Sequence, residues 1–351
     1  MGKNKKLGCL SLLLFTPMAM AMQPLDDQSL SAMTGQDGLT VSVNISKIDF
    51  KQAAIIDNDG FSNPDATLPG KAALVMATSP GGPANIGVDF VQTFNANGSI
   101  QNSSSELFKA VIDSDAGTGT NGAFANVALT LGSDVNGLRI RPFSVYLTPD
   151  QYDPRDSTKH AISTLVGSDY TQHSIFSTGT TLKSPNIKEL LRVSNNIDVK
   201  FITNNKPRMN IQLGASPQGH LVMFGGAIDS VCGTGSGCNM MLVADYVTAG
   251  DPSTAYGVGF DLQMTGKDAN GFSLNGFYAS IEGNAGSIPG ALVFGNKTTS
   301  DKLNLSLNNI MLGDKNASNA NNFNGLQNGS IGNIGAVGIS ATNLKMRVSG
   351  M

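Results

Sequence analysis

Apolar and polar residues alternate with a period of two along most of the chain, which is the pattern of β-strands that bury one face. Residue pairs typical of tight turns, such as Asn97-Gly98, Asn270-Gly271 and Asn275-Gly276, separate these runs. Many short strands with such turns predict an all-β fold: a β-sandwich or jelly-roll-like body, with a β-solenoid as the alternative. The clearest alternating runs are 41–45, 128–131, 138–140, 144–147, 197–201, 210–213, 303–307 and 338–341.

Helical signals are few, and we expect only one or two short helices. Ser184–Arg192 has a serine cap, a proline at the first helical position and an apolar stripe, so it predicts a short helix across one end of the β-rich body. Near the end of the chain, Lys315–Gly332 is rich in Asn, Gly and Ser and predicts an exposed loop. A last strand is expected over Val337–Val348. It can pair within its own sheet or complete the sheet of a neighbouring subunit, and the first is the simpler interpretation.

The first 21 residues predict export. Lys3, Lys5 and Lys6 form a basic segment, an apolar core covers Leu7–Phe15, and Ala19-Met-Ala21 supplies small residues at the positions of a cleavage site. This is the order of a secretory signal peptide, which we expect to be cleaved after Ala21. The apolar core is too short to span a bilayer as a helix.

Residues 22–39 predict a leader made of one short helix and a turn. Leu25 and Leu30 are spaced as a hydrophobic staple around an Asp26 cap. Gly35 stands where a left-handed helix C-cap belongs. The helix would therefore carry an apolar face, formed by the two leucines together with Met33, on which either the protein's own body or a partner can pack.

The leader leads into the β-rich body, which we assign to residues 40–351. Asp37-Gly38 predicts a tight turn, and alternation predicts a strand over Thr40–Phe50. The residues from Leu25 to Gly38 spell Leu-Asp-Asp-x-x-Leu-Ser-x-x-Thr-Gly-Gln-Asp-Gly. This leader, directly after a signal peptide, resembles the N-terminus of the bacterial FilA-type pilus-assembly protein family. The resemblance is dense over 22–38 and loose through 44–50, and it implies a pilus-related, exported context.

Composition limits the classes of partner. Charged residues make up 14% of the chain and the formal net charge is −3, which becomes more negative once the three lysines of the signal peptide are removed. An acidic chain without basic clusters is a poor ligand for nucleic acid or for anionic membrane surfaces. No segment after residue 21 is long and apolar enough to predict a transmembrane helix, so no transmembrane anchor is expected.

Candidate chemistry is sparse. Cys232 and Cys238 flank a glycine-rich loop, and in an exported protein such a pair predicts a disulfide. Metal ligation by the pair would need two further soft ligands, which the sequence does not place nearby. Asp57, Asp59 and Asp65 surround a glycine turn and are a candidate Ca²⁺ site, although they do not fit an EF-hand and ordinary Asx turns explain them better.

The sequence carries no catalytic motif, and we therefore expect a non-enzymatic protein without a cofactor other than this calcium candidate. The leading hypothesis is a structural or accessory protein of a pilus- or fimbria-like surface system, located in the periplasm or at the cell surface. Its partners would be other surface-assembly proteins or further copies of itself. The alternative is an adhesin-like module that binds a glycan or a host ligand through its Asn- and Gly-rich loops.

Overall fold

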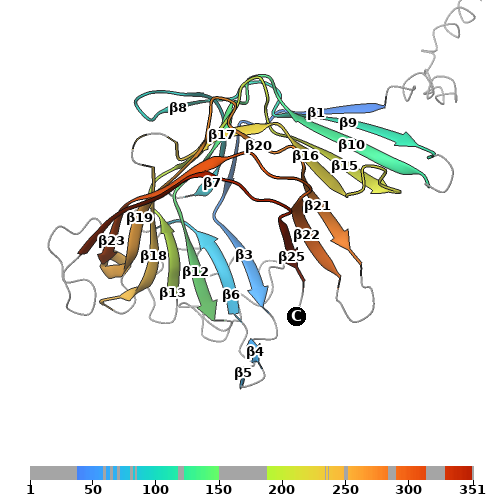
Figure 1. Ribbon diagram of the computed structural model, residues 1–351. Helices are drawn as coiled ribbons and strands as arrows, with labels where there is room; N and C mark the ends of the chain where they lie inside the picture. Colours follow the sequence, from blue (N-terminus) through green and yellow to red (C-terminus); the bar gives the residue numbers. More distant parts are fainter. Residues whose placement is uncertain are drawn as a thin grey trace, which may run out of the picture. The chain divides into compact units, whose positions relative to one another are not determined.

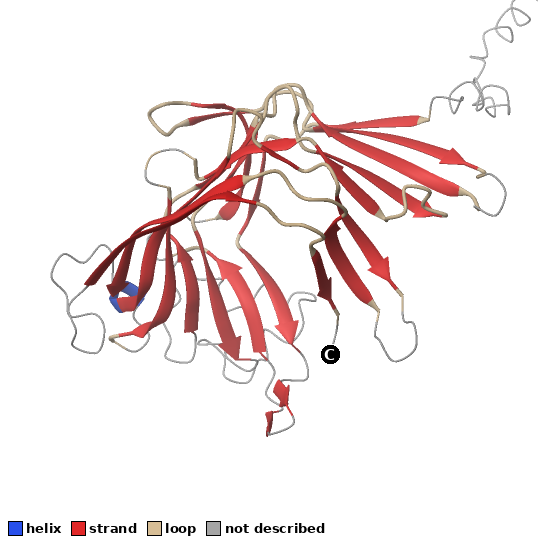
Figure 2. Cartoon of the chain, viewed as in Figure 1, coloured by secondary structure: helices blue, strands red, loops and turns tan. Residues whose placement is uncertain are grey.

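The structure, a computed structural model, is almost entirely β (Figures 1 and 2). The chain divides between Leu39 and Thr40 into two units, and nearly all of the first lies outside the residues that the structure describes. The described part contains a single 3₁₀ turn, Pro252–Thr254, and no apolar helix of bilayer-spanning length. The described residues are 38–57, 61–63, 66–68, 72–79, 82–83, 85–117, 122–149, 188–233, 235, 237–248, 252–283, 290–313 and 329–349.

One sheet has eight strands within the described residues, and every neighbouring pair whose register is defined is antiparallel. We call it the small sheet. In spatial order its strands are β1 (Leu39–Val43), β9 (Phe108–Asp115), β10 (Phe124–Leu131), β15 (Arg208–Gly214), β16 (Val222–Gly225), β21 (Phe277–Glu282), β22 (Ala291–Asn296) and β25 (Lys345–Val348).

The second sheet, which we call the large sheet, has fifteen strands within the described residues. Its main path is β2 (Lys47–Phe50), β7 (Ile86–Phe94), β11 (Gly137–Ile140), β14 (Ile197–Phe201), β17 (Ala227–Val231), β19 (Ala255–Gly266), β18 (Cys238–Tyr246), β13 (Lys188–Val193), β12 (Phe143–Pro149), β6 (Ala72–Ala77) and β3 (Gln52–Asp57). Four further strands pair with strands of this path or with each other: β8 (Ile100–Asn102) with β7, β20 (Phe272–Ser273) with β17, β23 (Leu303–Gly313) with β19, and β24 (Gly329–Ile339) with β23. The strands β4 (Phe61–Asn63) and β5 (Ala66–Leu68) form a separate two-stranded sheet.

Alternation gives the two faces of the large sheet opposite chemistry. On one face Arg139 lies between its register partners Asp89 and Asp198. Register partners on neighbouring strands share a face of the sheet. On the other face, successive register partners form an unbroken row of apolar side chains. That row runs through Phe90, Leu138, Val199, Val231, Met264 and Leu305.

The small sheet has an apolar row of the same kind, and the core forms where side chains from the two sheets meet. Buried Leu107, Val135 and Phe201 form its centre. Partly buried residues of both sheets pack against this cluster: Phe108 and Leu131 from the small sheet, and Phe90, Leu138, Val199 and Ile228 from the large sheet. Two antiparallel sheets that share an apolar core are sandwich-like, which confirms the predicted all-β class and favours the sandwich over the solenoid.

The predicted helix over Ser184–Arg192 is wrong. The described part of that segment is β13, an internal strand of the large sheet. Leu191 lies in register between Val145 and Leu242, and the Glu189 side chain on the opposite face is buried among polar partners. Sheet pairing on both sides therefore overrides the local helical pattern. Of the one or two short helices that we expected, the described residues contain only the 3₁₀ turn Pro252–Thr254.

Two strands predicted as continuous are divided between the sheets. The segment Thr40–Phe50 contains β1 of the small sheet and β2 of the large sheet, and Val337–Val348 contains the end of β24 and all of β25. In both places the backbone leaves one sheet and enters the other, as strands do at the corners of sandwiches. The predicted loop over Lys315–Gly332 is also too long, because β24 begins at Gly329.

Val135 provides a test of this core. Its side chain is completely buried although it stands in a loop. We expect Val135→Ala to lower the free energy of unfolding by about 2 kcal/mol, because the lost methyl groups leave a cavity beside Phe201. Val247→Ala, at a bend where the side chain is exposed, should change it by less than about 0.5 kcal/mol. Urea unfolding of both variants measures the difference, and equal effects would contradict the assigned core.

Candidate assembly surface

The free edge of β24 is the most unusual feature of the described surface. The strand reads Gly-Ser-Ile-Gly-Asn-Ile-Gly-Ala-Val-Gly-Ile, with neither a charge nor a proline in eleven residues. Within the described residues it pairs only with β23, so its second edge is unpaired. Ile331 and Ile334 are more than half exposed, and Val337 is 82% exposed. An unpaired edge of this length and composition is a template on which another strand can add.

Side-chain amides fix the irregular pairing of β24 on β23. The register shifts between Leu303 and Leu305 and again between Leu307 and Met311. Asn304 accepts a hydrogen bond from the backbone N–H of Gly338, and Asn333 accepts one from the backbone N–H of Asn309. These bonds replace ladder bonds lost at the bulges, so β24 is held in place even where its backbone departs from regular pairing.

Other strand edges carry the protection that β24 lacks. At the edge of the small sheet, Lys345 and Arg347 of β25 both form ion pairs with Glu282, at 2.6 Å. The edge strand β2 carries Lys47 and Asp49. Charged side chains on an edge oppose the docking of a further strand. The uncharged strands β1, β8 and β20 are only five, three and two residues long, so β24 is the long uncharged edge of the described part.

The small sheet adds an exposed apolar face. One row of register partners across seven of its strands is entirely apolar: Ile112, Val127, Ile211, Val222, Ala279, Phe294 and Met346. Next to this row, several large side chains remain accessible to solvent, with Ile281 at 71%. The others are Leu213, Leu292 and Val348, and Met346 of the row itself is 52% exposed. Exposed apolar surface of this extent is typical of an interaction surface.

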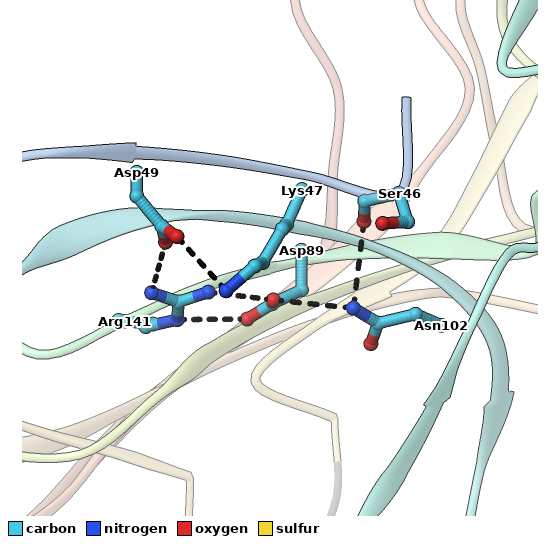
Figure 3. Close-up of polar contacts among 6 residues, drawn as sticks. All are labelled: Ser46, Lys47, Asp49, Asp89, Asn102 and Arg141. Carbon is cyan, nitrogen blue, oxygen red and sulfur yellow. Dashed lines mark hydrogen bonds and ion pairs between the residues drawn. The ribbon is translucent and has the colours of Figure 1, made fainter. Parts of the chain in front are cut away.

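An ion-pair network attaches β2 to the body (Figure 3). Arg141 donates two hydrogen bonds to Asp89, at 3.0 and 2.7 Å, and a third to Asp49. Lys47 pairs with Asp49 at 2.9 Å. Asn102 completes the group by donating to Asp89, at 3.4 Å. The network lies directly after the point where the chain crosses from β1 to β2, and it therefore fixes β2 on the large sheet.

A second network surrounds the buried carboxylate of Glu189. Arg192 binds it through two nitrogens, at 2.9 and 2.5 Å, Ser144 donates at 2.6 Å and Tyr246 at 3.0 Å. Burial, together with this carboxylate, raises the pKa of Tyr246 and that of Tyr146 above the ordinary value. Both carboxylate oxygens are bound by donors from three neighbouring strands, so the network fixes strand register.

His220 is the one described histidine. Its ring stacks on Tyr278 with the ring centroids 3.7 Å apart, and Nδ1 lies 2.9 Å from Oγ of Ser280. Burial, with the nearby Lys297, lowers the pKa of His220 below its ordinary value, which favours the neutral ring. If Ser280 were a nucleophile with His220 as its base, a further group would have to orient the histidine ring. Among the described residues, no carboxylate accepts a hydrogen bond from His220.

The structure brings together only part of the residues predicted from sequence. Cys232 and Cys238 form a disulfide with their Cα atoms 5.3 Å apart, which confirms the predicted pairing. Gly38 has a φ of +75°, in the left-handed region that suits glycine. Of the calcium candidates, Asp57 ends β3 but its side chain is outside the described residues, as are Asp59 and Asp65. The remaining leader residues also lie outside them: Leu25, Asp26, Leu30, Met33, Gly35 and Asp37.

Sequence reasoning missed the edge of β24 and both networks. The predicted loop over Lys315–Gly332 includes only the first four residues of β24, which are rich in Gly, and the predicted last strand includes only its end, although the absence of charge from 329 to 339 is a visible signal. The networks join residues far apart in the chain, such as Asp49 and Arg141, and carried no local signal. No cluster of three or more His, Cys, Asp or Glu side chains that could hold a metal occurs among the described residues.

Comparisons with known proteins add a single match. The model of a family described as "Family of unknown function (DUF6160)" matches residues 1–82. The chain is thus similar to that family over the predicted signal peptide, the leader and the segment through β6. No curated protein and no solved structure matches the chain.

Acid should weaken the attachment of β2. Hydrogen bonds from Lys47 and Arg141 hold the pKa of Asp49 below its ordinary value of 3.8. A carboxylate whose pKa is lower in the folded state stabilises the fold above its unfolded pKa and ceases to do so as pH falls through the folded pKa. We therefore expect Asp49→Asn to lower the melting temperature at pH 7 and to have a progressively smaller effect as the pH falls below 3.8. A constant difference across this range would contradict the network's role.

The disulfide should contribute a modest amount of stability. It closes a loop with a sequence separation of 6, for which the chain-entropy relation gives about 2 kcal/mol. We expect the double variant Cys232→Ala/Cys238→Ala to unfold with a free energy lower by about that amount in guanidinium titrations. A reducing agent should destabilise the parent protein to the same extent and leave the double variant unchanged. A response of the variant to the reductant would show that the reagent acts elsewhere.

Proposed function

We propose that this protein is an exported, non-enzymatic structural or accessory protein that assembles at the bacterial cell surface in a pilus- or fimbria-like system. The observation that carries the proposal is the free edge of β24, which is long, uncharged and firmly attached to the sheet. A strand of a neighbouring subunit can add to this edge and extend the large sheet from one molecule into the next. Its partners are other surface-assembly proteins or further copies of the same chain.

Addition of a strand supplies affinity through backbone hydrogen bonds, and it needs no charged recognition group. Each N–H and C=O on the free edge gains a partner in place of water. The isoleucines and the valine of β24 then lose exposed apolar surface, which stabilises the contact by about 25 cal/mol for each Å² removed from water. Because β24 carries no charge, two copies of it can also approach without like-charge repulsion.

Further features support a role outside the cytoplasm. The first residues have the order of a signal peptide, and the disulfide between Cys232 and Cys238 is of the kind that persists in oxidising compartments. The leader over residues 22–39 resembles the FilA-type pilus-assembly family and is a second candidate assembly element. The polar groups at the two networks are saturated by structural hydrogen bonds, which favours a scaffold over a catalyst.

A second candidate function is an adhesin-like module for a glycan or another host ligand. The observation that favours it is a group of side-chain amides on the small sheet, in which Asn210 donates to Asn126 and to Gln218. His220 follows Gln218 by two residues, and its ring stacks on that of Tyr278 in β21. Neutral amides and a ring face suit an uncharged, hydroxyl-rich ligand. Loss of filaments on gene deletion supports assembly, whereas normal filaments with lost attachment support adhesion.

Val337→Lys tests the proposed edge. A lysine at this exposed position near the end of β24 must lose water when another strand docks, and even about 1.4 kcal/mol of opposing free energy lowers association tenfold. We expect this variant to lose ordered oligomers in light scattering and negative-stain microscopy. Ala96→Lys adds the same charge in the exposed turn after β7 and should assemble like the parent protein.

Two further outcomes complete the design. A chain that begins at Gly38 keeps β1 whole but lacks the leader, so its failure to assemble would assign assembly to the leader instead of β24. Monodisperse, folded monomers of the parent protein, alone and mixed with the other proteins of its surface system, would exclude the proposal.

A further inference from the structure

An apolar cavity of about 310 Å³ lies beside the core where the two sheets meet. It is partly open to solvent. Its volume is near the lower end of the range of small-molecule sites, about 300–1,000 Å³. Both sheets line it: Phe108, Leu131 and Phe224 from the small sheet, and Phe90, Leu138 and Phe201 from the large sheet.

Strand alternation keeps charged side chains out of this cavity. Leu129, Met209 and Phe224 are successive register partners and share the apolar face of the small sheet. Thr130 and Arg208 also border the cavity, but they are partners of each other on the opposite face. The Arg208 guanidinium donates instead to the side chain of Asn205, at 3.2 Å. The walls therefore offer ring faces and methyl groups, with no group placed to bind an ionised head.

Such a space is unfavourable when it is left empty. Protein interiors are packed as densely as organic crystals, and voids larger than a water molecule are few. Water gains little in this cavity, because an apolar wall cannot supply the two to four hydrogen bonds that a buried water needs. Apolar guests do enter cavities of this kind, since they recover dispersion contacts with the wall and leave water themselves.

We propose that this cavity is a binding site for an uncharged, apolar small molecule, such as the hydrocarbon chain or ring of a neutral lipid-like compound. The aromatic side chains from both sheets would enclose the guest, and its burial would add contacts between the sheets at the edge of the core. The site is separate from the free edge of β24, and the inference does not depend on the proposed assembly function.

Titration of the purified full chain with the neutral fluorescent probe N-phenyl-1-naphthylamine tests the site. We expect saturable binding with one site per chain. Leu138→Phe places a larger side chain in the cavity and should weaken binding by roughly tenfold or more. Leu242→Phe adds the same bulk at a side chain that is 52% exposed on β18 and should leave binding unchanged. Near-ultraviolet circular dichroism checks that both variants are folded.

Met209→Phe fills the cavity from the small sheet and replaces Leu138→Phe if the latter does not fold. Absence of saturable binding to the parent protein would overturn the proposal. Equal weakening by Leu242→Phe would also overturn it, because the probe would then report exposed apolar surface. The anionic probe 1-anilinonaphthalene-8-sulfonate should bind at least roughly tenfold more weakly, since Arg208, the cationic residue at the border of the cavity, lies on the opposite face of its strand and binds Asn205. Tighter binding of the anionic probe would contradict the uncharged class of ligand.

Discussion

The two-residue alternation of its strands is the constraint on which this protein depends. In the large sheet it places Arg139 between Asp89 and Asp198 on one face and leaves a continuous apolar row on the other. The Arg139 guanidinium binds Asp198 through two nitrogens, at 2.6 and 2.7 Å, and both side chains are largely buried. A slip of one residue in any of these strands would move a charged group into the apolar row. The ion pair therefore specifies the register of these strands, and it contributes little net free energy to folding.

The same constraint explains how the two sheets are joined. The chain crosses between them at both ends of the described body, from β1 to β2 and from β24 to β25. At the first crossing Arg141, Asp89 and Asp49 fix the incoming strand, and at the second Glu282 binds Lys345 and Arg347 of the outgoing strand. At both crossings, ion pairs therefore bind a strand that has a sheet neighbour on one side only. There they supply the orientation that a second neighbour would otherwise give.

Local sequence predicted the fold class and many strands because alternation and turn chemistry are local properties. Ile197–Phe201 was found with its observed bounds, and the cysteine pair followed from spacing and compartment. Long-range pairing was not accessible in this way. The segment around Glu189 looked helical because its buried partners, Ser144 and Tyr246, lie about fifty residues away on either side. The cavity was equally invisible, since its walls come from strands of two sheets.

The low content of charge connects these features with the free edge of β24. With charged residues at 14% of the chain, the described ion pairs are concentrated at the register-fixing positions and at the crossings between sheets. An exposed edge in an ordinary soluble sheet is protected by lysine, proline or a twist away from its neighbours. β24 has register shifts in its pairing with β23 but carries no charged residue. The glycines among its first residues leave the backbone accessible to another strand. Selection for a monomer would favour a lysine on this strand, at little cost to its pairing with β23. The uncharged edge is therefore the feature that supports the proposed addition of a strand.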